Sequence, residues 1–425
     1  MAGFAAPAFA ALTSAPAPAP ADRMTPQERR ASASLSLVFA CRMLGLFLVL
    51  PVFALEAQRY PGGDDPALVG LAMGIYGLTQ GLLQIPFGVA SDRWGRKRVI
   101  LMGLAVFALG SFVAAAAPSL GWLIAGRALQ GAGAVSAAVT ALLADQTRDE
   151  VRTKAMAMVG ASIGLMFALS LVAAPALAAR IGLGGLFVVT GLLVIGCMAS
   201  VAWWTPPEPA AHKNQPRGRL AEVLRHAPLL RLNVGVFVLH AVQLAMWVAI
   251  PALLVQAGLV AERHWLVYLP AVLASFAVMA ATLFPLERRG YLRAVFLASI
   301  ALVGLVQLLL WAGAGRPGLV LLSGALFLFF CGFNVLEATQ PSMASRLAPP
   351  HARGTALGVY NTLQSLGFFA GGAVGGWLVQ RVGMGGLFAA CAALMGVWLA
   401  VAWPMRAPLR KPSPEEVLAD EAQAT

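Results

Sequence analysis

Long apolar stretches, separated by short polar segments, repeat along the whole chain. Each contains about 20 residues, which is enough for a helix to cross a hydrocarbon core of roughly 30 Å. A helix also satisfies its own backbone hydrogen bonds in lipid. The pattern therefore predicts an all-α integral membrane protein with twelve transmembrane helices, at residues 33–58, 67–91, 99–117, 119–144, 155–178, 184–204, 229–255, 265–286, 293–313, 318–345, 355–379 and 385–404.

The twelve predicted helices form two groups of six around a polar linker. We expect a tail, a six-helix bundle, a linker, a second bundle and a second tail, with bounds 1–32, 33–204, 205–228, 229–404 and 405–425. The halves also resemble each other, because residues 152–187 and 353–388 align without gaps and share 11 identities in 36. Shorter matches pair VFACR with VFVLH and DRWG with ERRG. Duplicated bundles of this kind are typical of secondary transporters, which bind substrate near the bilayer midplane where the halves meet.

Charge is scarce and unevenly placed. The chain is 59% hydrophobic and 11% charged, with a mean hydropathy of +0.78, a net charge of +12 and a pI of about 10.4. If the N-terminus is cytoplasmic, the cytoplasmic loops, tails and linker hold 23 of the 30 Lys and Arg residues, and the opposite loops hold five. The positive-inside rule then puts both termini in the cytoplasm. The basic charge indicates membrane topology, and we expect no nucleic-acid partner.

The sequence offers no signature of an enzyme or a metal site. Its four cysteines lie inside apolar stretches without the spacing of a metal or disulfide motif, at Cys41, Cys197, Cys331 and Cys391. No phosphate-binding loop or nucleophile elbow is present. We therefore expect no metal and no cofactor. Residues 1–22 are rich in Ala and Pro without a basic start, which favours a disordered tail over a cleaved signal peptide.

One short loop concentrates charge. Residues 88–98, GVASDRWGRKR, contain five charged side chains and two glycines. This loop resembles motif A of the major facilitator superfamily, and LIAGRALQGAGA at 123–134 resembles its motif B. TPQERR at 25–30 and GIYGLTQGLLQIPFG at 74–88 are similar to the proton-driven drug-antiporter branch, often called DHA1.

The resemblance implies the fold, activity and location of the superfamily. These are two pseudo-symmetric bundles that carry small molecules across a bacterial inner membrane by alternating access, as a monomer. Two departures concern regulation and exchange. The member that the chain most resembles has a soluble C-terminal domain, whereas this chain is expected to end in the short tail 405–425. Ala174–Pro175 stands where antiporters usually carry Gly-Pro.

The charged loop is predicted to act as a latch that closes the cytoplasmic side. A carboxylate near a helix N-terminus is favoured by roughly 0.3–2 kcal/mol, and the resemblance places Asp92 at the start of the eleventh helix, near Gly354–Thr355. Arg96 is expected to reach Asp145. The remaining latch residues are Gly88, which would admit a neighbouring helix, Gly95, which would permit the turn, and Arg93. The alternative is a simple positive-inside loop, which explains neither Asp92 nor the glycines.

Four ionisable residues inside the predicted helices are candidates for proton coupling. A charge at a helix centre costs roughly 2.5–3.5 kcal/mol on insertion scales, so such residues suggest function. Arginine stays charged in proteins, whereas carboxyl and imidazole groups titrate. We predict Glu337 as the main proton carrier and His240 as the second, with Arg127 and Arg42 tuning them or meeting an anionic substrate. Alternatively, His240 is a packing residue and Glu337 is a structural partner of an arginine.

Polar side chains on the cavity-lining helices are candidate substrate contacts. Polar groups are disfavoured in lipid, so they either line a water-filled cavity or form hydrogen bonds between helices. The candidates are Tyr76, Gln80, Gln84, Gln130, Gln243, Asn334, Tyr360, Asn361 and Gln364.

Together these observations predict a secondary transporter that exports small molecules in exchange for protons. A symporter or uniporter that imports a polar solute is a second possibility. A membrane receptor or scaffold that transports nothing is a third, although such a protein has no need of a latch or of Glu337.

Overall fold

The structure, a computed structural model, describes residues 23–208, 220–349 and 352–405. The predicted tails up to residue 22 and from residue 406, and residues 209–219 of the predicted linker, lie outside these ranges. All regular elements of the described residues are helical, which confirms the all-α fold. They are α1 (Pro26–Phe47), α2 (Leu50–Glu56), η1 (Ala57–Arg59), α3 (Pro66–Trp94), α4 (Arg96–Ala115), α5 (Leu120–Ala132), α6 (Ser136–Asp145), α7 (Asp149–Ala199), η2 (Ser200–Trp204), α8 (Leu220–Arg225), α9 (Ala227–Gln256), η3 (Ala261–Arg263), α10 (Trp265–Arg288), α11 (Leu292–Gly313), α12 (Leu319–Leu347) and α13 (Arg353–Ala402).

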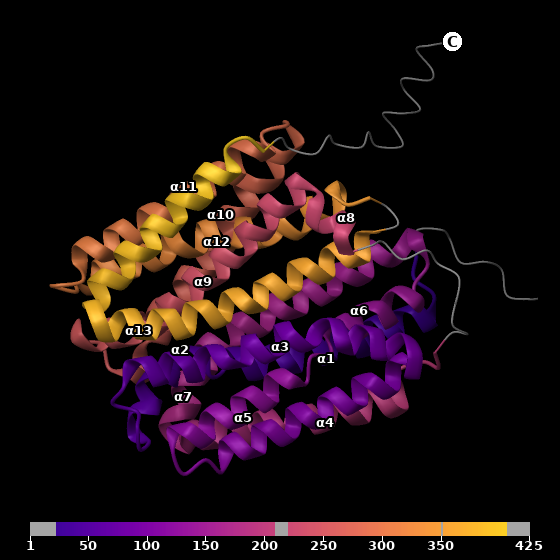
Figure 1. Ribbon diagram of the computed structural model, residues 1–425, viewed down its shortest axis with the longest axis horizontal. Coiled ribbons are helices and arrows are strands. Elements are labelled where there is room, and N and C mark those ends of the chain that lie inside the picture. The colour runs from indigo at the N-terminus through magenta and orange to yellow at the C-terminus, as the bar shows by residue number, and fades with distance from the viewer. Residues whose placement is uncertain (1–22, 209–219, 350–351, 406–425) are drawn as a thin grey trace, which may run out of the picture.

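Ten helical segments of the described chain are long and apolar enough to cross a membrane. Two of them, α7 and α13, have 51 and 50 residues, and each consists of two helices joined at one non-helical glycine, Gly182 or Gly383. In Figure 1, α13 crosses the molecule in orange and returns in yellow. Two of the ten segments cross twice and the other eight cross once, which accounts for the twelve predicted crossings.

The same glycine-rich turn joins the last two helices of each bundle. Gly182 has φ 65° and ψ −178°, and Gly383 has φ 71° and ψ 178°, a conformation that is essentially restricted to glycine and costs other residues roughly 1–3 kcal/mol. A Cβ on Gly185 would lie 2.5 Å from the Ile181 side chain, and its counterpart in the second half meets a valine in the same way. The repeated sequence is therefore a repeated hairpin.

The first helix begins earlier than the apolar pattern predicts. Thr25 and Glu28 form a capping box, in which each side chain bonds the backbone N–H of the other, and the helix starts at Pro26. Residues 26–32 are thus helical, which corrects the predicted tail of 1–32. Glu28 also accepts bonds from the Arg148 backbone at 3.0 Å and from its guanidinium Nε at 2.8 Å, so this end of α1 is fastened to the start of α7.

Two crossings are interrupted inside the apolar region. The α1–α2 crossing breaks at residues 48–49, just before Pro51, and the α5–α6 crossing breaks at residues 133–135. A Cβ on Gly133 would lie 2.4 Å from the carbonyl oxygen of Gly103, so only glycine allows this approach to α4. Broken helices of this kind often frame the binding site of a transporter.

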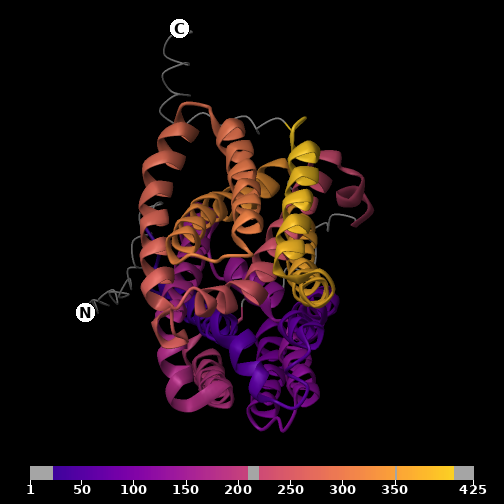
Figure 2. The ribbon, with the colours of Figure 1, turned by 90° about the vertical axis from the view of Figure 1, so that its left-hand side faces the viewer.

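The two bundles lie one above the other in Figures 1 and 2, and α3 and α13 run side by side between them. Glycines make this approach close, because a Cβ on Gly70 would lie 2.2 Å from the Gly372 carbonyl oxygen. Gly74 and Gly77 meet the α13 backbone in the same manner. Gly88 does not, since a Cβ there would make an ordinary 3.7 Å contact with Ala137. Gly70, Gly74 and Gly77, and not Gly88 as predicted, therefore allow α3 to pack closely against another helix.

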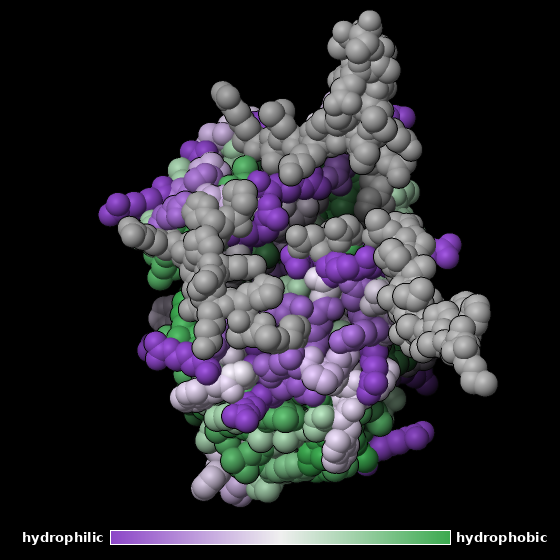
Figure 3. All heavy atoms as spheres, turned by 90° about the vertical axis from the view of Figure 1, so that its right-hand side faces the viewer, coloured by the Kyte–Doolittle hydropathy of each residue, from purple (hydrophilic) through white to green (hydrophobic). Residues whose placement is uncertain are grey.

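Exposed tryptophans ring both ends of the helices, as they do at membrane–water interfaces. We call the end where α3 ends and α4 begins the linker end. Its exposed tryptophans are Trp94, Trp203, Trp204 and Trp403, and those of the opposite end are Trp122, Trp265, Trp311 and Trp377. The linker end faces the viewer in Figure 3, where hydrophilic residues gather between the apolar flanks. The chain is a multi-pass membrane protein.

Candidate functional site

The centre of the first bundle is built around a buried arginine. Arg42 of α1 is 1% exposed, and its guanidinium donates to Ser136 Oγ at 2.6 Å and to the Tyr76 hydroxyl at 2.9 Å. A longer bond of 3.4 Å reaches Gln80 Oε1. Ser136 is the first residue of α6, so the break between α5 and α6 delivers this hydroxyl to the arginine.

A second buried arginine lies on the other side of the same tyrosine. Arg127 of α5 stands 5.1 Å above the Tyr76 ring and donates to Gln130 Oε1 at 3.1 Å. Gln130 in turn donates to Ser111 at 2.8 Å. A Cβ on Gly131 would clash with the backbone of Tyr76, so this glycine lets α5 bring the arginine against α3.

Neither central arginine forms an ion pair with a carboxylate in the part of the chain that the structure describes. No carboxylate of the described residues lies within 4.0 Å of the guanidinium of Arg42 or Arg127, and the Nε atom of each is buried without a hydrogen-bond partner there. Hydroxyls, amides and aromatic faces solvate the two charges instead. The first bundle thus has a fixed positive centre.

The second bundle has a titratable centre. His240 of α9 places Nδ1 2.8 Å from the Val236 carbonyl oxygen and Nε2 3.2 Å from Glu337 Oε2. The Gln364 amide nitrogen lies 2.8 Å from the same Nε2 and 3.3 Å from Glu337 Oε1. The Glu337 side chain is 41% exposed and that of His240 is 2% exposed, although the Oε2 atom that faces the ring is itself buried. Phe368, 4.9 Å from the ring centroid, helps to seal the imidazole.

One hydrogen bond connects the two centres across the bundle interface. Gln80, which also accepts from Arg42, donates to Ser365 of α13 at 3.2 Å. Ser365 follows Gln364, the residue that bonds both members of the second centre. A polar path therefore runs from Arg42 through neighbouring residues of α3 and α13 to Glu337.

The predicted cavity residues divide into two groups. Gln80, Asn361 and Gln364 are partly exposed, as a cavity lining requires. The others are buried: Tyr76 and Gln130 bind the arginines, Asn334 donates to Ser275 of α10 at 2.8 Å, and Gln84, Gln243 and Tyr360 bury amide or hydroxyl atoms that have no partner among the described residues. Asn334 forms a hydrogen bond between helices and does not line a cavity, because its face of α12 packs against α10.

The charged loop forms an ion cluster at the linker end. Arg96 contacts Asp92 at 3.1 Å and pairs with Asp145 at the end of α6. Gly95 has φ 95°, which permits the turn, and Arg93 is exposed. Asp92 and Thr355 both have interaction partners. The contact of Asp92 with the first turn of α13 stays a prediction.

Two contacts beside this cluster were not predicted from the sequence. Glu208 caps α4, since its carboxylate accepts from the backbone N–H groups of Arg96 at 3.0 Å and Lys97. The Lys97 ammonium donates to the Thr205 carbonyl oxygen at 3.0 Å, which is a specific contact as well as a topological charge.

The second bundle has an ion pair at the equivalent place, with the acidic and basic residues exchanged between the two helix ends. Glu287, at the end of α10, accepts from Arg346, at the end of α12, at 2.9 Å. Arg346 lies 201 residues after Asp145, the offset of the sequence repeat. The following arginines keep the same register, because Arg152 donates to the Ala144 carbonyl oxygen and Arg353 to the Ser345 carbonyl oxygen, both at 3.1 Å.

The register also reveals a residue that sequence reasoning missed. Ser136 lies 201 residues before Glu337, and Arg42 lies 198 residues before His240. The two pairs occupy equivalent positions in the two bundles. Applying the repeat offset to Glu337 would have identified Ser136 as the partner of Arg42.

A model of the Major Facilitator Superfamily matches residues 35–372 and 286–424. The chain belongs to the major facilitator superfamily. Over 409 residues it is 42% identical to the inner membrane transport protein YajR of Escherichia coli K12, covering 94% of this chain and 89% of that protein. It is 28% identical to the multidrug resistance protein MdtH of Aeromonas hydrophila, over 79% of this chain and 84% of that protein.

The fold agrees with solved members of the superfamily. The crystal structure of an auto-inhibited POT family peptide transporter superposes with a TM-score of 0.71 at 14% identity, covering 90% of this chain and 99% of that one. At this identity the likeness shows the fold alone. As a superfamily member the chain is a transporter of small molecules and not an enzyme.

Proposed function

We propose that this chain is a proton-coupled transporter that exports small molecules in exchange for protons, with Glu337 and His240 as the proton-carrying pair. The observation that carries the proposal is the 3.2 Å contact of His240 Nε2 with Glu337 Oε2. His240 Nδ1 lies 2.8 Å from a carbonyl oxygen and must donate to it. In the neutral ring, Nε2 is therefore a hydrogen-bond acceptor, and it faces a second acceptor, the carboxylate oxygen Oε2 of Glu337.

A proton between Nε2 and Glu337 Oε2 would join the two acceptors, and as they stand Glu337 Oε2 has no hydrogen-bond partner among the described residues. The pair can be an imidazolium with a carboxylate, or an imidazole with a carboxylic acid, and one proton serves both forms. When that proton leaves, the acceptors repel, and Gln364 can donate to the freed Nε2. Loss of the proton therefore favours a different arrangement of α9, α12 and α13, which is what coupling to alternating access requires.

Access to this proton depends on Glu337, whose side chain is far more exposed than that of His240. A substrate in the open space beside the carboxyl blocks its exchange with water, so proton and substrate compete. Competition of this kind yields exchange. The name of the relative MdtH, a multidrug resistance protein, supports export.

A second candidate, proton symport of an imported polar solute, is favoured by the uncompensated charges of Arg42 and Arg127. An anionic solute near these guanidinium groups would strengthen proton binding at Glu337 instead of competing with it. Proton and solute would then move together. The charge class of the substrate thus separates exchange from symport.

The linker end is proposed to face the cytoplasm of a bacterial cell whose inner membrane holds the protein as a monomer. The similarity to an inner membrane transport protein supports this location, and the charge asymmetry supports the orientation. There, Arg96 and Asp145 would hold the latch closed, and Asp92 would engage the start of α13.

The test uses protein reconstituted in liposomes with a pH-sensitive dye inside, and a panel of cationic, neutral and anionic amphipathic compounds. Exchange predicts that the lumen acidifies as a loaded substrate leaves, and symport predicts that it becomes more alkaline. Glu337→Gln should abolish transport driven by a pH gradient while exchange of preloaded substrate continues. Asn334→Ala, one turn away and bonded to α10, is the matched control and should keep coupling. Full gradient-driven transport in Glu337→Gln would contradict the assignment.

A further inference from the structure

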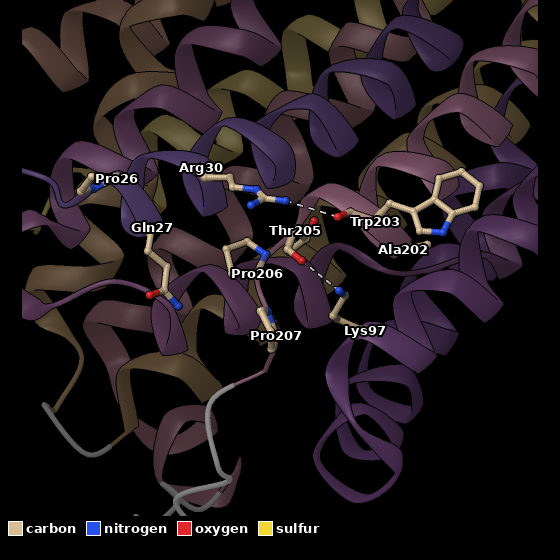
Figure 4. Close-up of a pocket in the computed structure, with 9 residues that line it drawn as sticks. All are labelled: Pro26, Gln27, Arg30, Lys97, Ala202, Trp203, Thr205, Pro206 and Pro207. Atoms are coloured by element: carbon tan, nitrogen blue, oxygen red, sulfur yellow. Dashed lines mark hydrogen bonds between the residues drawn. The ribbon is translucent and has the colours of Figure 1, made fainter.

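A pocket with a mixed polar and apolar lining opens at the linker end, away from the two centres. Its volume is about 570 Å³, within the roughly 300–1,000 Å³ typical of small-molecule sites. The first turns of α1, the start of α4 and the segment after α7 form its walls (Figure 4). They contribute Pro26, Gln27, Arg30, Lys97, Ala202, Trp203, Thr205, Pro206 and Pro207.

Two cations reach into this pocket from different helices. Arg30 donates to the carbonyl oxygens of Trp203 and Trp204, and Lys97 donates to that of Thr205, as Figure 4 shows for Trp203 and Thr205. These acceptors are uncharged. Within the described residues no carboxylate lies within 4.0 Å of the Arg30 guanidinium or the Lys97 ammonium, since Glu208 bonds the backbone N–H of Lys97, so neither cation forms an ion pair in the pocket.

The tryptophans beside the pocket indicate that it lies near the membrane surface. Trp203 on its rim is 81% exposed and belongs to the tryptophan ring of the linker end. Exposed apolar side chains continue from it toward the bilayer centre. Leu37 lies seven residues after Arg30 on the same face of α1, and Leu192 lies three turns before Trp203. Acyl chains can follow these two helices while a phosphate stays at the cations.

We propose that this pocket binds the phosphate headgroup of an anionic phospholipid, with Arg30 and Lys97 as the phosphate ligands. Arginine and lysine are the usual phosphate-binding side chains. The exposed apolar tracks favour a lipid over a free phosphate ion. Lys97 is adjacent to Arg96, so the lipid sits one residue from the ion cluster of the linker end.

Native mass spectrometry of the full chain, titrated with phosphatidylglycerol or phosphatidylcholine, tests the proposal. The wild-type protein should retain phosphatidylglycerol preferentially. Because each cation near an anionic surface contributes about 1 kcal/mol, Arg30→Gln and Lys97→Gln should each weaken retention about fivefold, and together about thirtyfold. Arg225→Gln, an exposed cation of α8 outside the pocket, is the matched control and should change nothing.

A second measurement is independent of variants that alter the cations. In liposomes, brominated phosphatidylglycerol should quench tryptophan fluorescence more than brominated phosphatidylcholine does, and Trp203→Phe should remove this difference. Equal retention of the two lipids would overturn the proposal. So would displacement of the lipid by millimolar inorganic phosphate, which would identify a free-anion site.

Discussion

The two bundles place the same kind of pair at the same position and give it opposite chemistry. In the first, Arg42 donates to Ser136 at 2.6 Å, and in the second, His240 faces Glu337 at 3.2 Å. The first pair has a permanent charge and a hydroxyl, so it cannot exchange a proton near neutral pH. The second pair consists of two titratable groups. Duplication supplied the geometry, and divergence of two side chains left titratable groups in only one of the two pairs.

The largest effect on transport is expected when the second bundle is given the arginine of the first. His240→Arg gives the second bundle the side chain of the first, and the guanidinium would hold Glu337 as a carboxylate. Transport driven by a pH gradient should fall to the level of protein-free liposomes, whereas downhill flux of the substrate continues. The measurement is substrate flux with and without an imposed gradient. Gradient-driven flux that survives in this variant would show that the pair does not carry the proton.

A smaller and symmetric effect is expected where the bundles remain alike. Gly182→Ala and Gly383→Ala place a side chain at positive φ and should each reduce the free energy of unfolding by about 1–3 kcal/mol. Gly196→Ala and Gly396→Ala are matched controls inside the same helices, where an added methyl has no atom within 4 Å, and should cause no loss. Unfolding in mild detergent measures all four. Unequal losses at the two turns would mean that the hairpins are not equivalent.

The smallest effect is expected at the linker end, where the charge order is reversed between the halves. Double-mutant cycles on Arg96 with Asp145 and on Glu287 with Arg346 should give coupling energies of about 0.2–1 kcal/mol, because all four side chains are partly exposed. The first value should be the larger, since Arg96 also contacts Asp92. Both couplings should decrease in high salt, and salt-independent values would argue against ion pairing.

The fold was largely predictable because its signals are local. Stretch length predicts each crossing, and glycine at positive φ explains why the RIGLGG and RVGMGG segments turn. The start of α1 was missed, although the capping box of Thr25 and Glu28 is visible in the sequence. An apolar count ignores helix caps, which are polar.

The centres were predictable only in part. Glu337 and His240 could be singled out because ionisable residues are rare in apolar helices, but nothing in their spacing reveals that they meet. Asn334 is an example of a residue whose predicted role was wrong. It shares a helix face with Glu337 by spacing, yet it bonds Ser275, because α10 packs against that part of α12.

The amino-acid sequence by itself determined the helices, their number and their duplication, since these follow from periodicity and chain-local conformation. The tertiary structure alone decided which partner each buried polar group received: Ser136 for Arg42, Gln364 for His240 and Glu208 for the start of α4. The physical reason is that hydrogen bonds between distant helices depend on how each helix is rotated and how closely it packs. Those quantities are set by the packing of all the helices together.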